Sequence, residues 1–167
     1  MGETIIETER LIIRNFDPED LDALYQLYEE SDTRYIEPLS EDRDEELAKL
    51  KSYIHYVYGF YGFGLWAVCL KENGRLIGRC GLQVEFIGDQ GEYEMGYMIS
   101  GKYARQGYAS EAVKAILEYA DEELEAPRVI LQIHSENQAS QTFAEKMGFY
   151  REPSKDRDRW KVYIYDL

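Results

Sequence analysis

The sequence predicts a mixed α/β fold, with one mostly antiparallel sheet and helices packed on its faces. Some segments carry apolar residues at helical spacing and others alternate with a period of two. Their order is strand, two helices, three antiparallel strands, helix, strand, helix and closing strands, with no repeat or linker between them. A length of 167 residues suits one domain, 1–167, and 44% hydrophobic residues exclude disordered and fibrous classes.

The N-terminal part is predicted to hold one strand, Thr8–Arg14, followed by two helices. Asp17-Pro18 offers an N-cap and a proline at the first helical position, and the helix ends near Glu30. A second helix is expected to begin at a Ser40 cap. Its buried side would carry Leu47, Leu50, Ile54 and Val57, and Gly59, Gly62 and Gly64 would close it.

From Leu65 onward the pattern becomes that of strands. Trp66–Leu70 and Leu76–Phe86 flank Asn73-Gly74, and an Asn-Gly pair supplies the positive φ angles of a tight hairpin turn. After a loop ending at Gly91, Tyr93–Ile99 is the next predicted strand.

The C-terminal part begins with a loop, Ser100–Gly107, that leads into an amphipathic helix. The apolar face of that helix consists of Ala109, Ala112, Val113, Ile116, Leu117 and Ala120. A strand, Val129–Ile133, and a short helix, Ala139–Met147, follow it. Phe149 and Trp160–Tyr165 are the predicted closing strands.

The composition limits partners and location. A net charge of −14 disfavours nucleic acid, which needs clustered Lys and Arg, and favours a cationic partner or simply a soluble surface. Met1–Arg14 lacks the features of a signal peptide, and no apolar run is long enough for a membrane span, so we expect a cytoplasmic protein. Cys69 and Cys80 lack the spacing of a zinc site and are expected to be reduced core thiols.

The loop before the long helix is a candidate anion site. The first N–H groups of a helix have no partner within it, and the helix dipole adds positive potential there. Gly107 and the small residues Ala109 and Ser110 would let a pyrophosphate approach, and Lys102 and Arg105 add positive charge. The alternative is a helix that begins at a glycine and only packs on the sheet.

The surrounding motifs resemble those of the GNAT acetyltransferases. Tyr97–Ala112 is similar to motif A, Q/R-x-x-G-x-G/A, with Gly107 and Ala109 in its last two places and Ala104 where Gln or Arg is usual. The RimJ/RimL-like branch has two further similar motifs. They are Thr8-Glu9-Arg10-Leu11-Ile12-Ile13-Arg14, and Asn137-Gln138-Ala139-Ser140 followed by Glu145-Lys146-Met147-Gly148-Phe149.

This resemblance implies a GNAT-like fold with a splayed strand pair, and acetyl-CoA as co-substrate without a metal. It also implies a set of cofactor-binding residues, namely Met98, Ile99, Lys102, Arg105, Gln106, Gly107, Tyr108, Ala109, Ser110, Asn137, Ser140 and Lys146. In such a family the second helix and its flanks build the acceptor pocket. The tyrosines of this region could line that pocket or belong to the core, and they are Tyr35, Tyr53, Tyr56, Tyr58 and Tyr61.

The expected reaction requires a base, because a primary amine is protonated at neutral pH and only the neutral nitrogen attacks a thioester. Glu94 and Glu85 are the candidates, unless both are solvated strand residues. Many relatives place an acidic tyrosine where this chain has Ala144, so Ser140 is the candidate proton donor, unless it only caps its helix. His134 and His55 are expected to be structural, and neither a metal site nor a Ser-His triad can be assembled.

The predicted function is therefore N-acetylation, by direct attack in a ternary complex, of a primary amine that is expected to be cationic. The acceptor could be a protein N-terminus or a small amine, and the enzyme a monomer or homodimer. Ala144 also suits an alternative, a non-catalytic acyl-CoA-binding or sensing module. A nucleotide-binding fold is disfavoured, because no G-x-G-x-x-G or Walker pattern is present.

Overall fold

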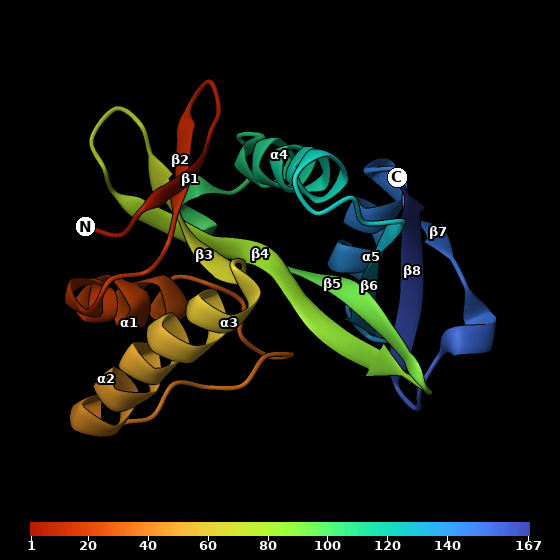
Figure 1. Ribbon diagram of the computed structural model, residues 1–167, viewed down its shortest axis with the longest axis horizontal. Helices are drawn as coiled ribbons and strands as arrows, with labels where there is room; N and C mark the ends of the chain where they lie inside the picture. The colour runs from red at the N-terminus through yellow and green to blue at the C-terminus, as the bar shows by residue number, and fades with distance from the viewer.

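The computed structural model describes all residues, 1–167, and is built on one eight-stranded sheet (Figure 1). The strand order is β1-β2-β3-β4-β5-β6-β8-β7, and β5–β6 is the only parallel neighbour pair. The strands are β1 (Thr4–Glu7), β2 (Leu11–Arg14), β3 (Leu65–Leu70), β4 (Leu76–Ile87), β5 (Gln90–Ile99), β6 (Arg128–His134), β7 (Tyr150–Arg151) and β8 (Trp160–Asp166).

Helices cover both faces of this sheet, which confirms the predicted mixed α/β class (Figure 1). One face carries α1 (Leu21–Glu29) and α2 (Arg43–Ser52), which continues through π-helical turns at Tyr53–Tyr58 into α3 (Gly59–Tyr61). The other face carries α4 (Tyr108–Glu122) and α5 (Gln138–Lys146). Short 3-10 turns are present at Pro18–Asp20, Gly101–Tyr103 and Pro153–Lys155.

The hydrophobic core is likewise divided by the sheet. The larger part lies under α4 and α5, where the predicted apolar face of α4 is buried at Ala112, Val113, Ile116, Leu117 and Ala120. A smaller cluster holds α1 and α2 against β3 and consists of Phe16, Leu24, Leu50, Ala67 and Cys69. Cys80 and Cys69 are buried free thiols, and burial raises the pKa of both.

Strands β5 and β6 separate soon after they meet. Their parallel register comprises only Tyr93 opposite Val129 and Glu94 opposite Ile130. Beyond these pairs β6 continues beside β8 as far as His134, whereas β5 continues beside β4 as far as Ile99. The β6-facing edge of β5 therefore has no strand partner from Met95 to Ile99, which is the splayed pair implied by the family resemblance.

Four local predictions were wrong, at element ends and in one turn. The first strand is a hairpin, with β1 before it and Thr8–Arg10 as the turn, because the chain reverses at these polar residues. The N-cap of α2 is Asp42, whose carboxylate accepts the N–H groups of Asp44 and Glu45, whereas the Ser40 hydroxyl bonds to the Glu45 side chain.

The turn between β3 and β4 also differs from the prediction, although the hairpin itself is confirmed. Only Gly74 has a positive φ, 74°, and Asn73 does not. The Leu70 carbonyl accepts the Gly74 N–H, which closes a longer loop in place of a two-residue turn. Likewise, β5 begins at Gln90 instead of Tyr93, because the chain turns at Gly88 with φ 64°.

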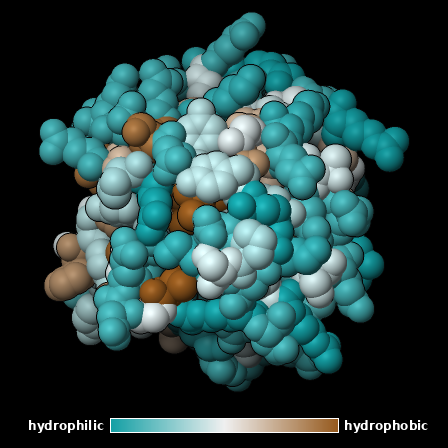
Figure 2. All heavy atoms as spheres, turned by 90° about the vertical axis from the view of Figure 1, so that its right-hand side faces the viewer, coloured by the Kyte–Doolittle hydropathy of each residue, from teal (hydrophilic) through white to brown (hydrophobic).

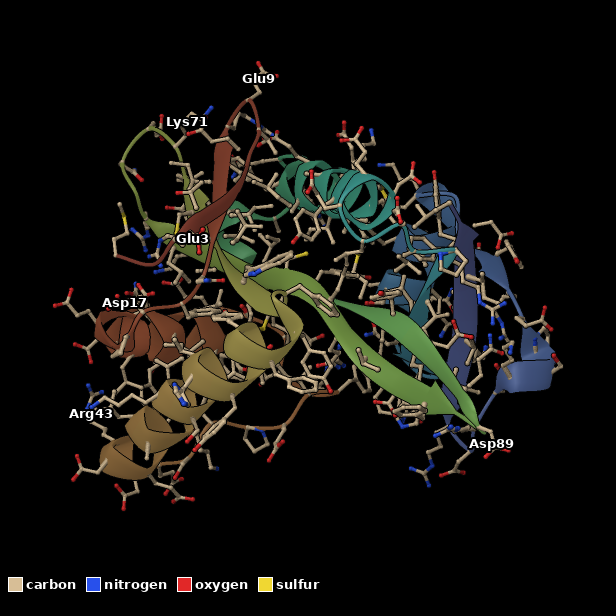
Figure 3. The ribbon with its side chains drawn as sticks, in the orientation of Figure 1. Glu3, Glu9, Asp17, Arg43, Lys71 and Asp89 are labelled. Atoms are coloured by element: carbon tan, nitrogen blue, oxygen red, sulfur yellow. The ribbon has the colours of Figure 1, made fainter.

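The surface is polar and largely acidic, in line with the net charge of −14. Figure 3 shows charged side chains projecting outward, among them Glu9 at the β1–β2 turn and Asp89 at the tip of the β4–β5 hairpin. On the face that includes β7 and β8, Figure 2 shows only small hydrophobic spots among hydrophilic atoms. None of the helices has both the length and the apolar character needed to cross a bilayer.

The turn of the β1–β2 hairpin is tied to the first turn of α4 by one carboxylate. The Thr8 hydroxyl donates to Glu111 at 2.6 Å, and Arg10 donates to it from its backbone N–H at 3.0 Å and from Nε at 2.8 Å. The Arg10 guanidinium also lies 4.1 Å from the centre of the Tyr108 ring. Residues more than 100 positions apart are thus joined at the start of α4.

Replacement of Glu111 by alanine is predicted to destabilise the fold. Loss of these charge-assisted hydrogen bonds should lower the free energy of unfolding by about 2 kcal/mol at pH 7, measured by urea denaturation. The matched control is Glu118→Ala on the exposed side of the same helix, which should change it by less than about 0.5 kcal/mol.

The difference between wild type and Glu111→Ala should also depend on pH. Burial raises the pKa of the Glu111 carboxyl, but hydrogen bonds from Thr8 and Arg10 outweigh burial, so its pKa lies below the ordinary value. The stabilisation is therefore complete above the unfolded pKa and is lost as the pH falls through the folded pKa. An equally large difference at pH 7 and at pH 2 would contradict this account.

Candidate active site

The loop that precedes α4 presents unpartnered backbone donors. Gly107 is the N-cap of α4 with φ 82°, a left-handed conformation that favours glycine. The N–H groups from Gln106 to Ser110 donate to no acceptor in the molecule. A Cβ on Gly107 would lie 3.3 Å from Nη2 of Arg10 and would restrict the approach to these donors. A row of unpartnered donors at a helix N-terminus is suited to an anion.

The predicted basic residues of this loop differ in their surroundings. Lys102 is engaged by Glu30 at 3.0 Å, and the Glu30 carboxylate also accepts the Ser100 hydroxyl at 2.7 Å. Hydrogen bonds from Ser100 and Lys102 lower the pKa of Glu30 to about 2. Arg105 is exposed and free of ion pairs, with φ 60°.

A further basic residue, Arg10, was missed by the sequence-based prediction of the site. Its Nη1 donates to the Gln106 carbonyl at 2.9 Å and so fixes the end of the loop that leads into α4. In the sequence, only the T-x-R-L motif pointed to this residue. Its role at the loop depends on the fold, which brings the β1–β2 turn beside the loop. The positive charge beside the unpartnered N–H groups therefore includes the side chain of Arg10, which lies near the N-terminus of the chain.

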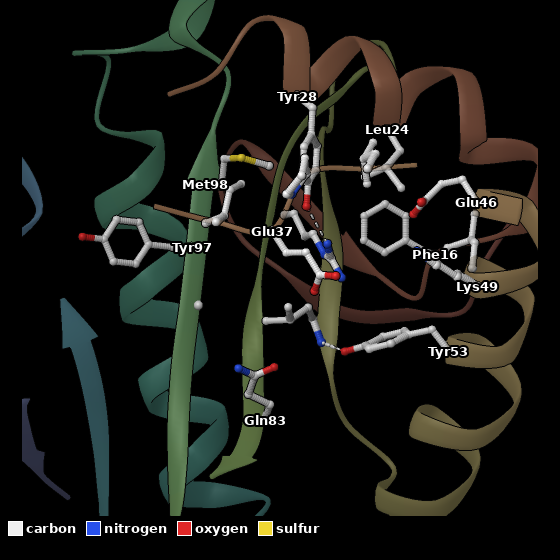
Figure 4. A pocket seen from close by; sticks show the side chains of 17 residues that line it. Phe16, Leu24, Tyr28, Glu37, Glu46, Lys49, Tyr53, Gln83, Tyr97 and Met98 are labelled. Atoms are coloured by element: carbon white, nitrogen blue, oxygen red, sulfur yellow. Dashed lines mark hydrogen bonds between the residues drawn. The ribbon is translucent and has the colours of Figure 1, made fainter. Parts of the chain in front are cut away.

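Near the open edge of β5, one face of the sheet lines a cavity and the other packs on the hydrophobic core. Met98 lines a cavity on the α1/α2 side, whereas Ile99 packs on the core under α4. Tyr97 also points to the α4/α5 side, and in Figure 4 its hydroxyl is directed away from Phe16 and Tyr53. That hydroxyl is buried without a hydrogen bond. Burial raises its pKa to about 12, although the nearby Ser140 side chain lowers it.

Helix α5 places the second group of predicted residues. Asn137 is its N-cap and accepts the Ser140 N–H at 3.2 Å, so both residues lie at the end of α5 that follows β6. Ser140 is half-buried beside Tyr97. Lys146 lies at the opposite end of α5, about 13 Å along the helix axis from Asn137, and is not brought together with them.

The cavity beside Met98 has a volume of about 520 Å³ (Figure 4). Its walls come from α1, α2, the connection between them and the face of β4 and β5. Aromatic and charged side chains in its lining include Phe16, Tyr28, Glu37, Glu46, Tyr53 and Arg79. Of the predicted acceptor-site tyrosines, only Tyr53 lines it. Tyr58 is buried, Tyr56 and Tyr61 are exposed, and Tyr35 stacks on His134.

The candidate bases lie near the point where β5 and β6 separate. Glu94 is half-buried and accepts a hydrogen bond from Gln132 on β6 at 2.6 Å. Burial raises the pKa of its carboxyl, and the neighbouring charge of Glu85 raises it further. Neither glutamate lines the cavity, although Gln83, which is paired in register with Glu94, does.

The remaining polar groups have structural surroundings. His134 accepts the Glu136 N–H through Nδ1 at 3.1 Å and contacts Tyr35 and Trp160 through its ring. The acids that do line the cavity, Glu37 and Glu46, were not among the predicted residues, because they belong to the connection and helix whose position depends on tertiary packing. No group of three or more His, Cys, Asp or Glu side chains is placed to hold a metal ion.

Known proteins are similar to this chain in sequence and in fold. The acetyltransferase (GNAT) domain model matches residues 10–150. An uncharacterised N-acetyltransferase of Bacillus subtilis, YnaD, is 30% identical over 168 aligned residues, which cover 97% of this chain and 95% of YnaD.

Solved structures agree at the level of the fold. The crystal structure of an acetyltransferase from Agrobacterium tumefaciens has a TM-score of 0.78 at 22% identity and covers 100% of this chain and 96% of its own. RimL, a ribosomal-protein α-N-acetyltransferase, was solved with coenzyme A. It has a TM-score of 0.74 at 17% identity, with 99% and 98% covered. The domain match and the YnaD alignment confirm the resemblance seen in the motifs, and the chain therefore belongs to the GNAT family of N-acetyltransferases.

Proposed function

We propose that the protein transfers an acetyl group from acetyl-CoA to a primary amine, either a protein N-terminus, as the name of RimL describes for that protein, or a small amine. The observation that carries the proposal is the row of unpartnered N–H groups from Gln106 to Ser110, beside the open edge of β5. These donors suit a pyrophosphate, and a strand edge without a partner suits the amides of a pantetheine arm.

The binding residues divide between the two sides of the separated strands. Gly107, Tyr108, Ala109 and Ser110 would hold the phosphates through their backbone. Met98 and Ile99 would offer the strand edge, and Asn137 and Ser140 would contact the cofactor from α5. Lys102 and Arg105 contribute positive charge to the loop, whereas Lys146 would act only on a part of the cofactor that extends along α5.

Acetyl-CoA would supply an activated thioester, whose carbonyl carbon the amine nitrogen attacks while the carbon–sulfur bond breaks. Glu94 is the proposed base and would accept the ammonium proton through water, with Glu85 as the second candidate. Ser140 is the proposed donor of a proton to the leaving sulfur. The Tyr97 hydroxyl lies near Ser140 and is buried without a hydrogen bond.

A non-catalytic acyl-CoA-binding module is the second candidate. Ala144 is fully buried and occupies the position where the resemblance implies a tyrosine that acts as general acid. Release of free thiol from acetyl-CoA, measured with a panel of amines, distinguishes the two: a module would bind acetyl-CoA without amine-dependent release.

Replacement of Gly107 by glutamate is predicted to abolish binding of acetyl-CoA. The new side chain would add bulk and negative charge at the phosphate donors, and it would strain a residue at φ 82°. Calorimetric titration should show saturable binding to wild type and none to the variant. Gly88→Glu is the matched control, since Gly88 has φ 64° and open space around it and lies in the β4–β5 turn, at the opposite end of β5 from the loop. A folded wild type that fails to bind acetyl-CoA would refute the proposal.

Replacement of Glu94 by glutamine is predicted to lower kcat/KM by about 10²-fold or more, because the base is lost. In wild type, burial raises the pKa of this carboxyl, so activity should fall, as the medium is acidified, at a pH above the ordinary carboxyl value. Glu85→Gln removes a like charge and should move this fall to lower pH with a smaller loss of rate. A pH profile that is identical in all three proteins would refute the role of Glu94.

The same substitution is predicted to stabilise the protein at neutral pH. A carboxyl whose folded pKa is raised binds more protons in the folded state, so its ionisation destabilises the fold as the pH rises through that pKa. Glu94→Gln should therefore raise Tm at pH 7 by roughly 3 °C for each kcal/mol recovered. A lower Tm would mean that the ionised carboxylate stabilises the fold.

A further inference from the structure

Arg79 on β4 is a charged side chain in the cavity wall that lacks a counter-ion. No carboxylate oxygen lies within 4.0 Å of its guanidinium nitrogens, so Arg79 forms no ion pair. Its one hydrogen bond is from Nη1 to the neutral Tyr28 hydroxyl, at 2.9 Å, and its Nε is buried without a partner. In a chain with 33 acidic and 19 basic residues, an unpaired arginine in a pocket is unusual.

The groups around Arg79 orient the guanidinium without neutralising it. The rings of Phe16 and Tyr53 lie 5.8 Å from its central carbon, and their faces attract a cation. The Tyr53 hydroxyl accepts the Leu65 N–H at 2.7 Å and lies near the guanidinium without a hydrogen bond to it. Figure 4 shows Tyr28 and Tyr53 on opposite sides of the cavity that this arginine lines.

The register of the sheet sets Arg79 beside the reactive edge. Arg79 is paired with Met98, and Met98 lines the cavity at the part of β5 that lacks a β6 partner. Gly96, two residues earlier on the same face, leaves room on the cavity floor. A small molecule whose anionic end lies at Arg79 could therefore present its amine to the open strand edge.

We infer that the acceptor is a zwitterion, a small amine with a carboxylate that Arg79 binds. Arginine matches the two oxygens of a carboxylate, and that anion would supply the missing counter-charge. The carboxylates of Glu37 and Glu46 also line the cavity, together with Lys49, whose ammonium lies 3.6 Å from the Glu45 carboxylate. The site therefore suits a cationic amine together with one negative charge. The inference rests on the proposed function and names the class of its acceptor.

The test compares each of the twenty amino acids with its carboxamide, which keeps the amine and side chain but removes the negative charge. With wild-type protein and acetyl-CoA, the best amino acid should have a kcat/KM at least tenfold above that of its amide. Arg79→Gln should remove this preference by lowering kcat/KM of the acid at least tenfold, while the amide changes less than about twofold. Arg79→Lys should retain part of the preference.

The control is Lys114→Gln, which removes one positive charge from the exposed side of α4 and should leave the preference intact. Thermal unfolding establishes that each variant is folded. Equal rates for acids and amides in wild type would overturn the inference while the proposed function stands. An equal loss for both in Arg79→Gln would assign the residue to the thioester and would also overturn it.

A direct binding measurement separates the two hypotheses. Protein saturated with coenzyme A is titrated calorimetrically with the amino acids, and binding that is weakened at least tenfold in Arg79→Gln supports the carboxylate site even where thiol release is absent. Absence of thiol release with every amine, together with intact acetyl-CoA binding, would refute the proposed function alone. Unchanged amino-acid binding in Arg79→Gln would refute the carboxylate site alone.

Discussion

The separation of β5 from β6 is the constraint on which the site depends. A strand inside a sheet can pair on both edges, but β6 pairs with β8 from Arg128 to His134 and with β5 at only two positions. The backbone of β5 beyond Glu94 is therefore left with one occupied edge. The helix that follows β5 begins beside this gap and the helix that follows β6 begins across it, so the unpaired edge, the N-terminus of α4 and the cap of α5 share one region.

Overall charge and local charge lead to different expectations for the acceptor. The net charge of −14 favours a cation at long range, as the composition suggested. Inside the cavity, however, Arg79 lacks an acidic partner while Glu37 and Glu46 stand in the same lining. The acidic surface acts on diffusion toward the protein, whereas selection among bound molecules depends on groups within a few ångströms, so the two observations are compatible.

The sequence was sufficient wherever a local signal determined the structure. Asp17 caps the first helical turn with Pro18 after it, and Gly107 begins α4 at a positive φ, because these residue types have strong local preferences. The family motifs added the separated strands and the phosphate loop. Strand β1 was missed because TIIE, short and partly exposed, gives a weak period-two signal. Asp42 displaced Ser40 as a cap because several acceptors compete there.

The candidate site residues that the sequence did not predict were missed for a different reason. Arg10 reaches the loop through hydrogen bonds to Glu111 and Gln106, Tyr97 meets Ser140 across the gap, and Arg79 faces helices that lie earlier in the chain. None of these neighbourhoods is close in sequence. Their chemistry follows from the register of the sheet and from helix docking, which a single sequence without its fold does not specify.

The Glu30 carboxylate joins the two halves of the site mechanically. Glu30 follows α1, whose Leu24 and Tyr28 form part of the cavity wall. Its carboxylate holds Ser100 and Lys102 at the start of the loop, and its backbone carbonyl accepts the Gly101 N–H at 2.8 Å. An acceptor that bound as proposed and moved α1 would therefore pull on the loop 100–107, where the cofactor is proposed to bind. Since such coupling is reciprocal, each ligand would change the affinity of the other by the same factor, and order of addition would be a property of the fold as much as of the chemistry.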